Sequence, residues 1–472
     1  MRKNNIPKRF IALIVIVAAF GAALTFAISR SPDLGGIFNG SLPSEAVFLI
    51  GSLLVLLPVL LIGLLFALHM KSKAEPAELQ TKAMFQSVSV IEEKAESSAD
   101  LSETEDSEDT ASGKVRFFML SKLDEEREKL IRKSYADDIT LSELCERFRN
   151  FAASRLKLYY DISDIRKFIS GLAVSRIMII QGISGTGKTS LAYAFGEFID
   201  NTATVIPVQP MWKERTDLIG YYNEFTKRFN ETTLLQKIYE ANYSKDIYIT
   251  LLDEMNIARV EYYFAEFLSL LELPNPEKRY LDVVSDKWES DPVQLKSGQI
   301  KLAGNMWFIG TANNDDSTFS ISDKVYDRAM VLNLDYKSEV FTAPKTDALP
   351  VSADHFCRLA ELAQREYAVT RRNVKRLEEL DAYLIRNFHI TFGNRIRKQI
   401  MTYIPVYLAC GGGELEALDD ILAKKIMRKL EMQNPVYLRN AADEFCAYLD
   451  ELFGQDRMKQ CKAYIARLTK NA

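Results

Sequence analysis

A glycine-rich loop follows a short apolar run at Met178–Gln181. The loop reads "GISGTGKTS" and fits the pattern GxxxxGK[ST] without a gap. An apolar helical pattern, "SLAYAFGEFI", begins directly after it. This order of a strand, a curled loop and the start of a helix predicts a phosphate-binding loop. In such a loop the backbone N–H groups and the positive end of the helix face one anion. The predicted nucleotide-binding residues are Gly182, Ser184, Gly185, Thr186, Gly187, Lys188, Thr189 and Ser190.

Two side chains of this loop have their own chemistry. Lys188 can reach the β- and γ-phosphates of a nucleotide, and the hydroxyl of Thr189 can be a ligand of Mg²⁺. The alternative is a chance glycine-rich turn before a helix. The uninterrupted motif between a strand and a helix favours the phosphate-binding interpretation.

A second run, "DIYITLLDEMN", predicts a buried strand at Ile247–Leu252 that ends in two acids. Asp253 is placed to hold Mg²⁺ through water. Glu254 is placed to polarise the attacking water as a general base. Acidic residues often end strands, so the pattern is weak alone and becomes strong after a phosphate-binding loop.

A third strand-like run, "MWFIGTANND" at Met306–Asp315, has a polar tail. Ligands in open α/β sheets lie outside the carboxyl ends of the strands, so this tail should reach the same sheet edge. Asn313 is our candidate for orienting water and sensing the γ-phosphate. The alternative is an asparagine in an ordinary turn after a strand.

In this order, the motifs resemble a AAA+ ATPase of the clade that contains the MoxR, McrB and dynein-related modules. The resemblance covers residues 176–429. It rests on "GISGTGKTS" (Walker A), a Trp-containing segment from Trp212 to Asn223, "LLDEMNIARVEYYFAEFLSLLE" (Walker B), "FIGTANNDDSTFSISDKVYDRA" and "FGNRIRKQI". Two features depart from McrB-type modules: Ile257 follows "DEMN" where an arginine is usual, and "GTANNDDST" replaces "GTMNTADRS". These departures favour ATP over GTP.

The resemblance implies roles for two arginines. Arg328 lies before an expected last strand at Met330–Leu334 and would reach the γ-phosphate of a neighbouring subunit, where a guanidinium stabilises transition-state charge. The alternative is a surface or ion-paired arginine. Arg395, preferred over Arg397, would contact phosphate from a helical lid.

Two further segments are expected to be insertions. Leu281–Leu302 reads as two strand-like pieces around a polar turn, and the clade carries a β-hairpin there that faces the central pore. Tyr221, Tyr222 and Phe225 are candidates for lining such a pore, or equally for packing in a core or between subunits.

Composition disfavours some classes of protein. The 472 residues carry 60 basic and 64 acidic side chains, for a net charge of -4, which disfavours a dedicated nucleic-acid binder. The five cysteines are scattered and only three histidines occur, so neither a zinc site nor a disulfide framework is indicated.

The beginning of the chain is different. Residues 10–29 and 46–70 are uncharged apolar runs, each long enough to span a bilayer. Basic residues flank the pair, and the loop between them carries little positive charge, which predicts both ends in the cytoplasm. A cleaved signal peptide is the alternative for the first run.

We therefore expect an α/β fold in five parts. A transmembrane hairpin (residues 1–73) precedes an acidic disordered linker (74–113) and a helical lead-in (114–171). A P-loop AAA+ core with a central parallel sheet (172–337) and a helical lid with a C-terminal helical extension (338–472) follow.

The leading functional hypothesis is an integral membrane ATPase whose catalytic domain lies in the cytoplasm. It would bind ATP and Mg²⁺ between protomers of a ring, expected to be a hexamer, and remodel a protein partner. The alternatives are an McrB-like motor of a restriction or defence system and a non-hydrolysing nucleotide-gated scaffold. The charge balance disfavours a nucleic-acid partner.

Overall fold

The computed structural model describes residues 115–132, 134–313 and 318–470. The predicted spans at 10–29 and 46–70 and the predicted linker at 74–113 lie outside the described residues. Within the described part of the chain, none of the helices is both long and apolar enough to cross a membrane.

A five-stranded parallel sheet forms the centre, in the order β10-β1-β9-β5-β2. This confirms the predicted α/β class with a central parallel sheet. The four strands predicted for this sheet are present, with ends that differ by one to three residues, and the fifth, β2, was not predicted. The strands are β1 (Ile177–Gln181), β2 (Thr204–Pro207), β5 (Tyr248–Asp253), β9 (Met306–Ala312) and β10 (Met330–Asn333).

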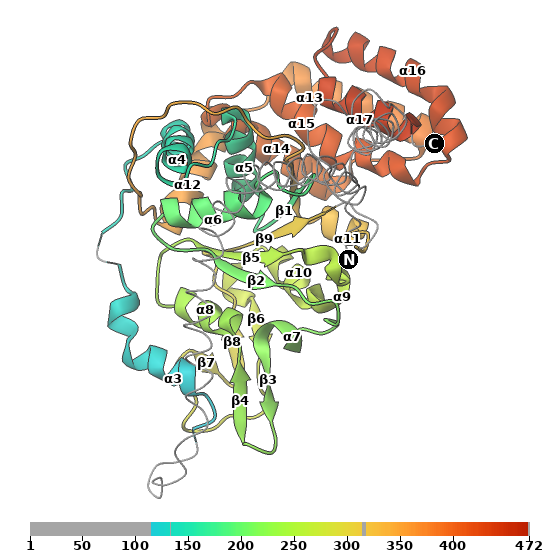
Figure 1. Cartoon of the computed structure of the whole chain (residues 1–472). Coiled ribbons are helices and arrows are strands. Elements are labelled where there is room, and N and C mark those ends of the chain that lie inside the picture. Colours follow the sequence, from blue (N-terminus) through green and yellow to red (C-terminus); the bar gives the residue numbers. More distant parts are fainter. Residues whose placement is uncertain (1–114, 133, 314–317, 471–472) are drawn as a thin grey trace, which may run out of the picture. The chain divides into compact units, whose positions relative to one another are not determined.

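Both faces of the sheet are covered, because alternate residues of each strand point to opposite sides. On β1, Met178 and Ile180 belong to one hydrophobic core, while Ile177 and Ile179 belong to the other. Figure 1 shows the helices of the first core above the sheet and those of the second core below it. The first core is formed with α4 (Leu141–Leu156), α5 (Ile162–Val174) and α6 (Lys188–Phe198), and the second with α8 (Thr233–Ala241), α9 (Val260–Tyr263) and α10 (Ala265–Glu272).

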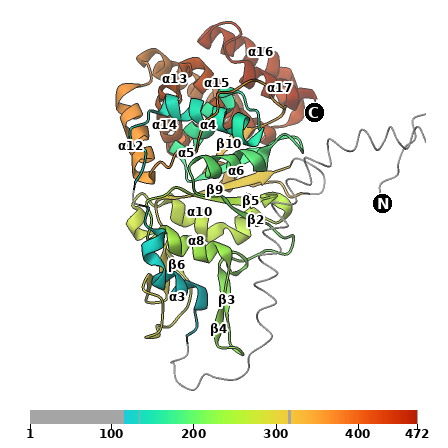
Figure 2. The same cartoon turned by 60° about the vertical axis from the view of Figure 1, so that its left-hand side comes forward.

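The predicted helical lead-in divides between these two faces. The helix α3 (Phe118–Glu125) and the short 3₁₀ turn η3 (Arg127–Leu130) come first, and α3 packs against α8 on the second face. Figure 2 shows α3 beside the strand β6 (Tyr280–Asp282), on the side of the sheet opposite α4 and α5. The helices α4 and α5 pack on the opposite face against α6 and α14 (Gly393–Ala409).

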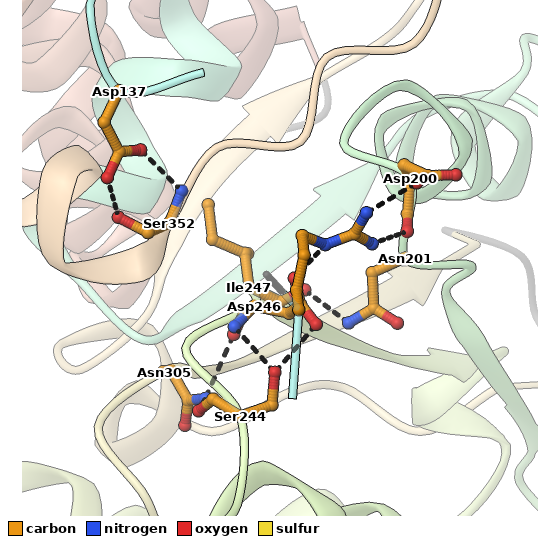
Figure 3. A network of polar contacts seen from close by, with 9 residues as sticks. Asp137, Asp200, Asn201, Ser244, Asp246, Ile247, Asn305 and Ser352 are labelled. Atoms are coloured by element: carbon orange, nitrogen blue, oxygen red, sulfur yellow. Dashed lines mark hydrogen bonds and ion pairs between the residues drawn. The ribbon is translucent and has the colours of Figure 1, made fainter. Parts of the chain in front are cut away.

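A polar network fixes the segment that crosses from one face to the other. The guanidinium of Arg132 pairs with Asp246 just before β5 and with Asp200 just after α6, both at 2.8 Å. Figure 3 shows the neighbouring contacts, in which Asp137 accepts from Ser352 and the amide of Asn305 donates to nearby carbonyls. The network ties the lead-in to the sheet at the edge opposite the glycine-rich loop.

Two β insertions extend below the sheet (Figure 1). The first is a hairpin of β3 (Gly220–Asn223) and β4 (Arg228–Glu231), preceded by α7 (Thr216–Ile219). Phe225, in its turn, is 98% exposed, whereas the ring of Tyr222 contacts that of Trp288.

The second insertion corrects the expectation of two strand-like pieces at 281–302. It has three strands in the order β6-β8-β7. Ser297 and Gly298, between β7 and β8, both have positive φ, as a two-residue type I′ turn requires. The extra strand comes from this tight turn, which divides the second predicted piece into two short strands. The strands are β6 (Tyr280–Asp282), β7 (Leu295–Lys296) and β8 (Gln299–Lys301), after the 3₁₀ turn η5 (Pro276–Lys278).

The C-terminal third is helical, as its apolar spacing predicted. Its helices pack into the same hydrophobic core as α4, α5 and α6. They are α12 (Ala353–Glu366), α13 (Arg371–Phe388), α14 (Gly393–Ala409), α15 (Glu414–Lys425), the 3₁₀ turn η6 (Met427–Met432), α16 (Pro435–Phe453) and α17 (Lys459–Lys470).

Candidate functional site

The glycine-rich loop leaves β1 and enters α6 through backbone conformations that favour glycine. Gly182 has φ of 146°, and a Cβ there would lie 2.1 Å from the carbonyl oxygen of Leu334. Gly187, which precedes α6, has φ of 92°. Ser184 and Gly185 are exposed, while Thr186 and Ser190 are half-buried. The loop therefore curls tightly before the N-terminus of an 11-residue helix, the arrangement that binds phosphate.

The amine of Lys188 is turned into this loop. The residue is buried, and its Nζ donates to the carbonyls of Gly182 and Ile183, each at 3.0 Å. On the other side of the loop, the hydroxyl of Tyr160 donates to the carbonyl of Gly187 at 3.1 Å. Burial raises the pKa of Tyr160, so it is a neutral donor at physiological pH. Sequence reasoning missed Tyr160, which lies in the helical lead-in and carries no motif.

Three oxygen-bearing side chains meet beside the loop. The hydroxyls of Thr189 and Thr311 each donate to Oδ1 of Asp253, both at 2.8 Å. Mg²⁺ binds hard oxygen ligands and typically takes one or two from protein, with phosphate and water completing its shell. Thr189 and Asp253 fit that demand. No group of three or more His, Cys, Asp and Glu side chains with metal-binding geometry occurs among the described residues.

Glu254 is held in an uncommon backbone conformation next to this cluster. Its φ and ψ are 51° and 47°, a left-handed geometry that costs a residue with a Cβ about 1–3 kcal/mol. The amide N–H of Glu254 donates to the Thr311 hydroxyl at 2.9 Å. The strained backbone turns at the end of β5 and leaves the side chain exposed.

Asn313 lies opposite Glu254. Its Nδ2 is 3.4 Å from Oε1 of Glu254, while its buried Oδ1 has no hydrogen-bond partner within the part of the chain that is described. An unsatisfied buried acceptor in a site of this kind is suited to a bound water. The amide of Asn256 positions this end of β9, because it donates to the carbonyls of Asn313 (3.0 Å) and Phe319 (3.2 Å). Sequence reasoning did not single out Asn256.

Arg328 and Arg395 lie elsewhere. Arg328 precedes β10, and its carbonyl accepts from Ser175, which precedes β1. Both guanidiniums pair with Glu272 at the end of α10, Arg328 at 2.7 Å. A cavity of about 380 Å³ lies there, lined by these three residues and by Arg176 and Ile177.

The predicted contact of Arg395 with phosphate from a helical lid stays a prediction, but the structure places Arg395 away from the nucleotide-binding loop of its own chain. The loop follows the carboxyl end of β1, whereas Arg395 shares a cavity with Ile177 at the amino end. Five strand residues at about 3.3 Å each separate the two ends by roughly 15 Å. Arg395 therefore groups with Arg328, and its lid helix approaches the edge of the sheet opposite the loop. Arg397 instead pairs with Glu378.

The comparisons with known proteins divide the chain into two matched parts. Residues 177–329 match the family described as AAA domain (dynein-related subfamily), and residues 345–472 match a domain of unknown function, DUF8727. No protein in the curated set matches the chain. The first match, with the parallel sheet and its P-loop, shows an α/β nucleotide-binding domain of the AAA+ type.

Solved structures give weaker likenesses. A candidate ATPase from Cytophaga hutchinsonii is 13% identical, covers 65% of this chain and 88% of its own, and has a TM-score of 0.42. A full-length MCM homolog from Methanopyrus kandleri is 10% identical, covers 65% of this chain and 58% of its own, and has a TM-score of 0.33.

Proposed function

We propose that the chain is a membrane-anchored ATPase that hydrolyses Mg·ATP at sites shared between protomers of a ring, and that it uses turnover to remodel a protein partner. The observation that carries this proposal is the division of the candidate site between two opposite edges of one sheet. The loop, the acids and Asn313 are at the carboxyl edge, and Arg328 and Arg395 are at the amino edge.

The division favours assembly. The roughly 15 Å length of β1 separates Arg328 from the phosphate-binding loop of its own chain. A second copy, docked with its amino edge against this carboxyl edge, would supply the arginines. Such a head-to-tail contact uses two different surfaces, and its repetition closes a ring when the rotation allows it. The match to an AAA domain supports the same arrangement.

Each residue then has a defined task. Lys188 and the loop amides bind the β- and γ-phosphates, and Thr189 and Asp253 would hold Mg²⁺, which neutralises phosphate charge. Glu254 accepts a proton from the attacking water, which Asn313 helps to orient. The guanidinium of Arg328 from the next protomer stabilises charge that develops in the transition state.

Mixing two inactive variants of the full-length protein tests the shared site. Glu254→Gln removes the base and Arg328→Ala removes the arginine, so neither should turn over ATP alone. In a mixture, some interfaces combine Glu254 of one chain with Arg328 of another. If subunits mix randomly and sites act independently, about a quarter of the sites are intact and turnover returns to about a quarter of the wild-type rate.

The outcomes separate the alternatives. No recovery on mixing, with both variants still assembled, would contradict a shared site. ATP binding by the wild type without turnover at any concentration would leave a nucleotide-gated scaffold.

The membrane anchor is proposed from the sequence of residues 10–29 and 46–70 alone. We expect the full-length chain to stay with membranes after alkaline carbonate extraction, and a chain that lacks residues 1–73 to be released. Release of the full-length chain would refute the anchor and leave the ATPase proposal standing.

A further inference from the structure

A single carboxylate connects the two arginines at the amino edge. Glu272 is the last residue of α10, and its two oxygens contact different guanidiniums: Oε2 is 2.7 Å from Arg328, and Oε1 pairs with Arg395. Arg328 belongs to the α/β part of the chain, whereas Arg395 is in the first turn of α14 in the C-terminal helical part. Glu272 is therefore the point at which a sheet-side cation and a lid-side cation are brought together.

The charges around this contact are unbalanced. The cavity at Glu272 is lined by five cationic side chains, and Glu272 is the one acidic residue among the described residues that line it. The cations are Arg176, Arg279, Arg328, Arg395 and Lys398. A surface with this composition attracts an anion, and guanidiniums are suited to phosphate because they donate two parallel hydrogen bonds.

The contact also orders the arginines. A side chain of this length loses up to about 2 kcal/mol of conformational entropy when it is fixed in one rotamer. Arg395 is 46% exposed, and its pairing with Glu272 restrains it before any ligand arrives. Arg328 keeps an unused donor, because its buried Nε makes no hydrogen bond within the described residues.

We propose that Glu272 is a positioning residue that sets the spacing of Arg328 and Arg395, so that both guanidiniums meet one phosphate group of the ATP held by the next protomer. This inference rests on the proposed function. Glu272 acts through the arginines and does not contact the nucleotide, since a carboxylate repels phosphate. Its negative charge therefore lowers the attraction for ATP, while its geometry favours the reaction.

The charge of Glu272 should weaken ATP binding, whereas its positioning of the arginines should speed hydrolysis. Because KM and kcat report these two effects separately, the inference can be tested. In Glu272→Gln the carboxamide keeps the size of the side chain but cannot pair with two cations. We expect kcat to fall by about tenfold or more, because small misplacements of catalytic groups have effects of that size. The KM for ATP should stay unchanged or fall, because one negative charge is lost near the phosphate. General structural damage would instead raise KM and weaken assembly.

A matched control lies on the same helix. Glu266 of α10 pairs with Arg215 at 3.0 Å, and both side chains are 31% exposed, close to the 30% of Glu272. Glu266→Gln makes the same chemical change away from the two arginines. We expect its kcat and KM to equal those of the wild type in the full-length protein.

A double variant asks whether Glu272 acts through Arg395. If it does, Glu272→Gln should cost less in an Arg395→Ala background than in the wild type. Losses that simply multiply would overturn the inference. Three other results would overturn the inference: kcat and KM of Glu272→Gln equal to those of Glu266→Gln, a higher kcat in Glu272→Gln, or a higher KM in Glu272→Gln with an unchanged kcat.

The subunit-mixing experiment separates this failure from failure of the proposed function. If Glu254→Gln and Arg328→Ala complement each other and Glu272→Gln behaves as its control does, the shared site stands and only the role of Glu272 is refuted. If they do not complement each other, the proposed function itself fails and takes the positioning inference with it.

Discussion

Replacement of Lys425 by methionine should change how the stability of the protein depends on pH. Lys425 is the last residue of α15 and is 3% exposed. Its amine donates to the carbonyl of Tyr326 at 2.7 Å and to that of Ala329. These two carbonyls flank Arg328 in sequence, so Lys425 supports the loop that carries the proposed trans-acting arginine.

Burial lowers the pKa of Lys425 to about 7, from an ordinary value of 10.5. The carboxylate of Asp327 opposes this shift, and the positive charges of Arg428, Arg395 and Lys429 add to it. Between pH 7 and 10.5 the unfolded chain holds a proton on this amine that the folded chain releases. Stability therefore rises as the pH increases through this window, and below pH 7 the cost of burying the charged amine is fully present.

The size of the effect follows from the two pKa values. Between pH 6 and pH 8.5, the wild type should gain about 2 kcal/mol of unfolding free energy that Lys425→Met does not gain. For large domains a change of 1 kcal/mol moves the melting temperature by about 2–4 °C or less. The expected difference is therefore a few degrees.

Thermal unfolding of the full-length protein at pH 6 and pH 8.5 measures this difference between the wild type and Lys425→Met. The quantity is the shift in melting temperature between pH 6 and pH 8.5, for the wild type minus that for Lys425→Met. Lys375→Met is the control, because Lys375 on α13 is 79% exposed at its side chain. Equal shifts in the wild type and Lys425→Met, or a larger shift in Lys425→Met, would refute the reasoning.

Three further predictions concern the nucleotide site. Thr189→Ala should weaken ATP binding by about tenfold or more in the presence of Mg²⁺ and leave binding in EDTA unchanged, because the hydroxyl beside Asp253 is a proposed metal ligand. Calorimetric titration with ATP, with and without Mg²⁺, measures both affinities. Gly182→Ala should abolish ATP binding with or without metal, because the new Cβ would overlap the carbonyl of Leu334; retained affinity in the same titration would contradict this. Tyr160→Phe should lower the unfolding free energy by about 1 kcal/mol through loss of one hydrogen bond to the loop, which denaturant titration measures; a change below about 0.3 kcal/mol would show that this bond contributes little.

The half of the candidate site at the carboxyl edge could be predicted from sequence because short-range patterns determine it. Apolar runs end at Gln181, Asp253 and Ala312, and in a parallel sheet these ends share one edge. The polar residues that follow each run must therefore lie together. The contacts of Thr189 with Asp253 and of Asn313 with Glu254 agree with this reasoning, although they do not test the catalytic roles.

The half at the amino edge was not predictable in the same way. Glu272 ends the segment quoted for the Walker B resemblance, but its type and spacing give it no special role there, and it meets Arg395 only because α14 packs where the amino ends of the strands lie. Lys425 binds a carbonyl that lies 99 residues earlier in the chain. Contacts of this range depend on how helices dock, and the apolar spacing of a helix predicts its buried face without predicting its partner.

The two halves also differ in what supports them. β1, β5 and β9, all within residues 177–329, carry the phosphate-binding half. The loop that carries Arg328 is held in place by three side chains of residues 399–428. Gln399 donates to the carbonyl of Asp327 at 3.1 Å, and Lys425 donates to the carbonyls of Tyr326 and Ala329 on either side of Arg328. Arg428 pairs with Asp323.

Gln399, Lys425 and Arg428 lie in the region that matches a domain of unknown function. A physical role for that region follows from its contacts: it positions the loop and the arginine that would serve the neighbouring site. Under the proposed function, the residues that would bind ATP and the arginine that would complete the neighbouring site are therefore held by different parts of one chain.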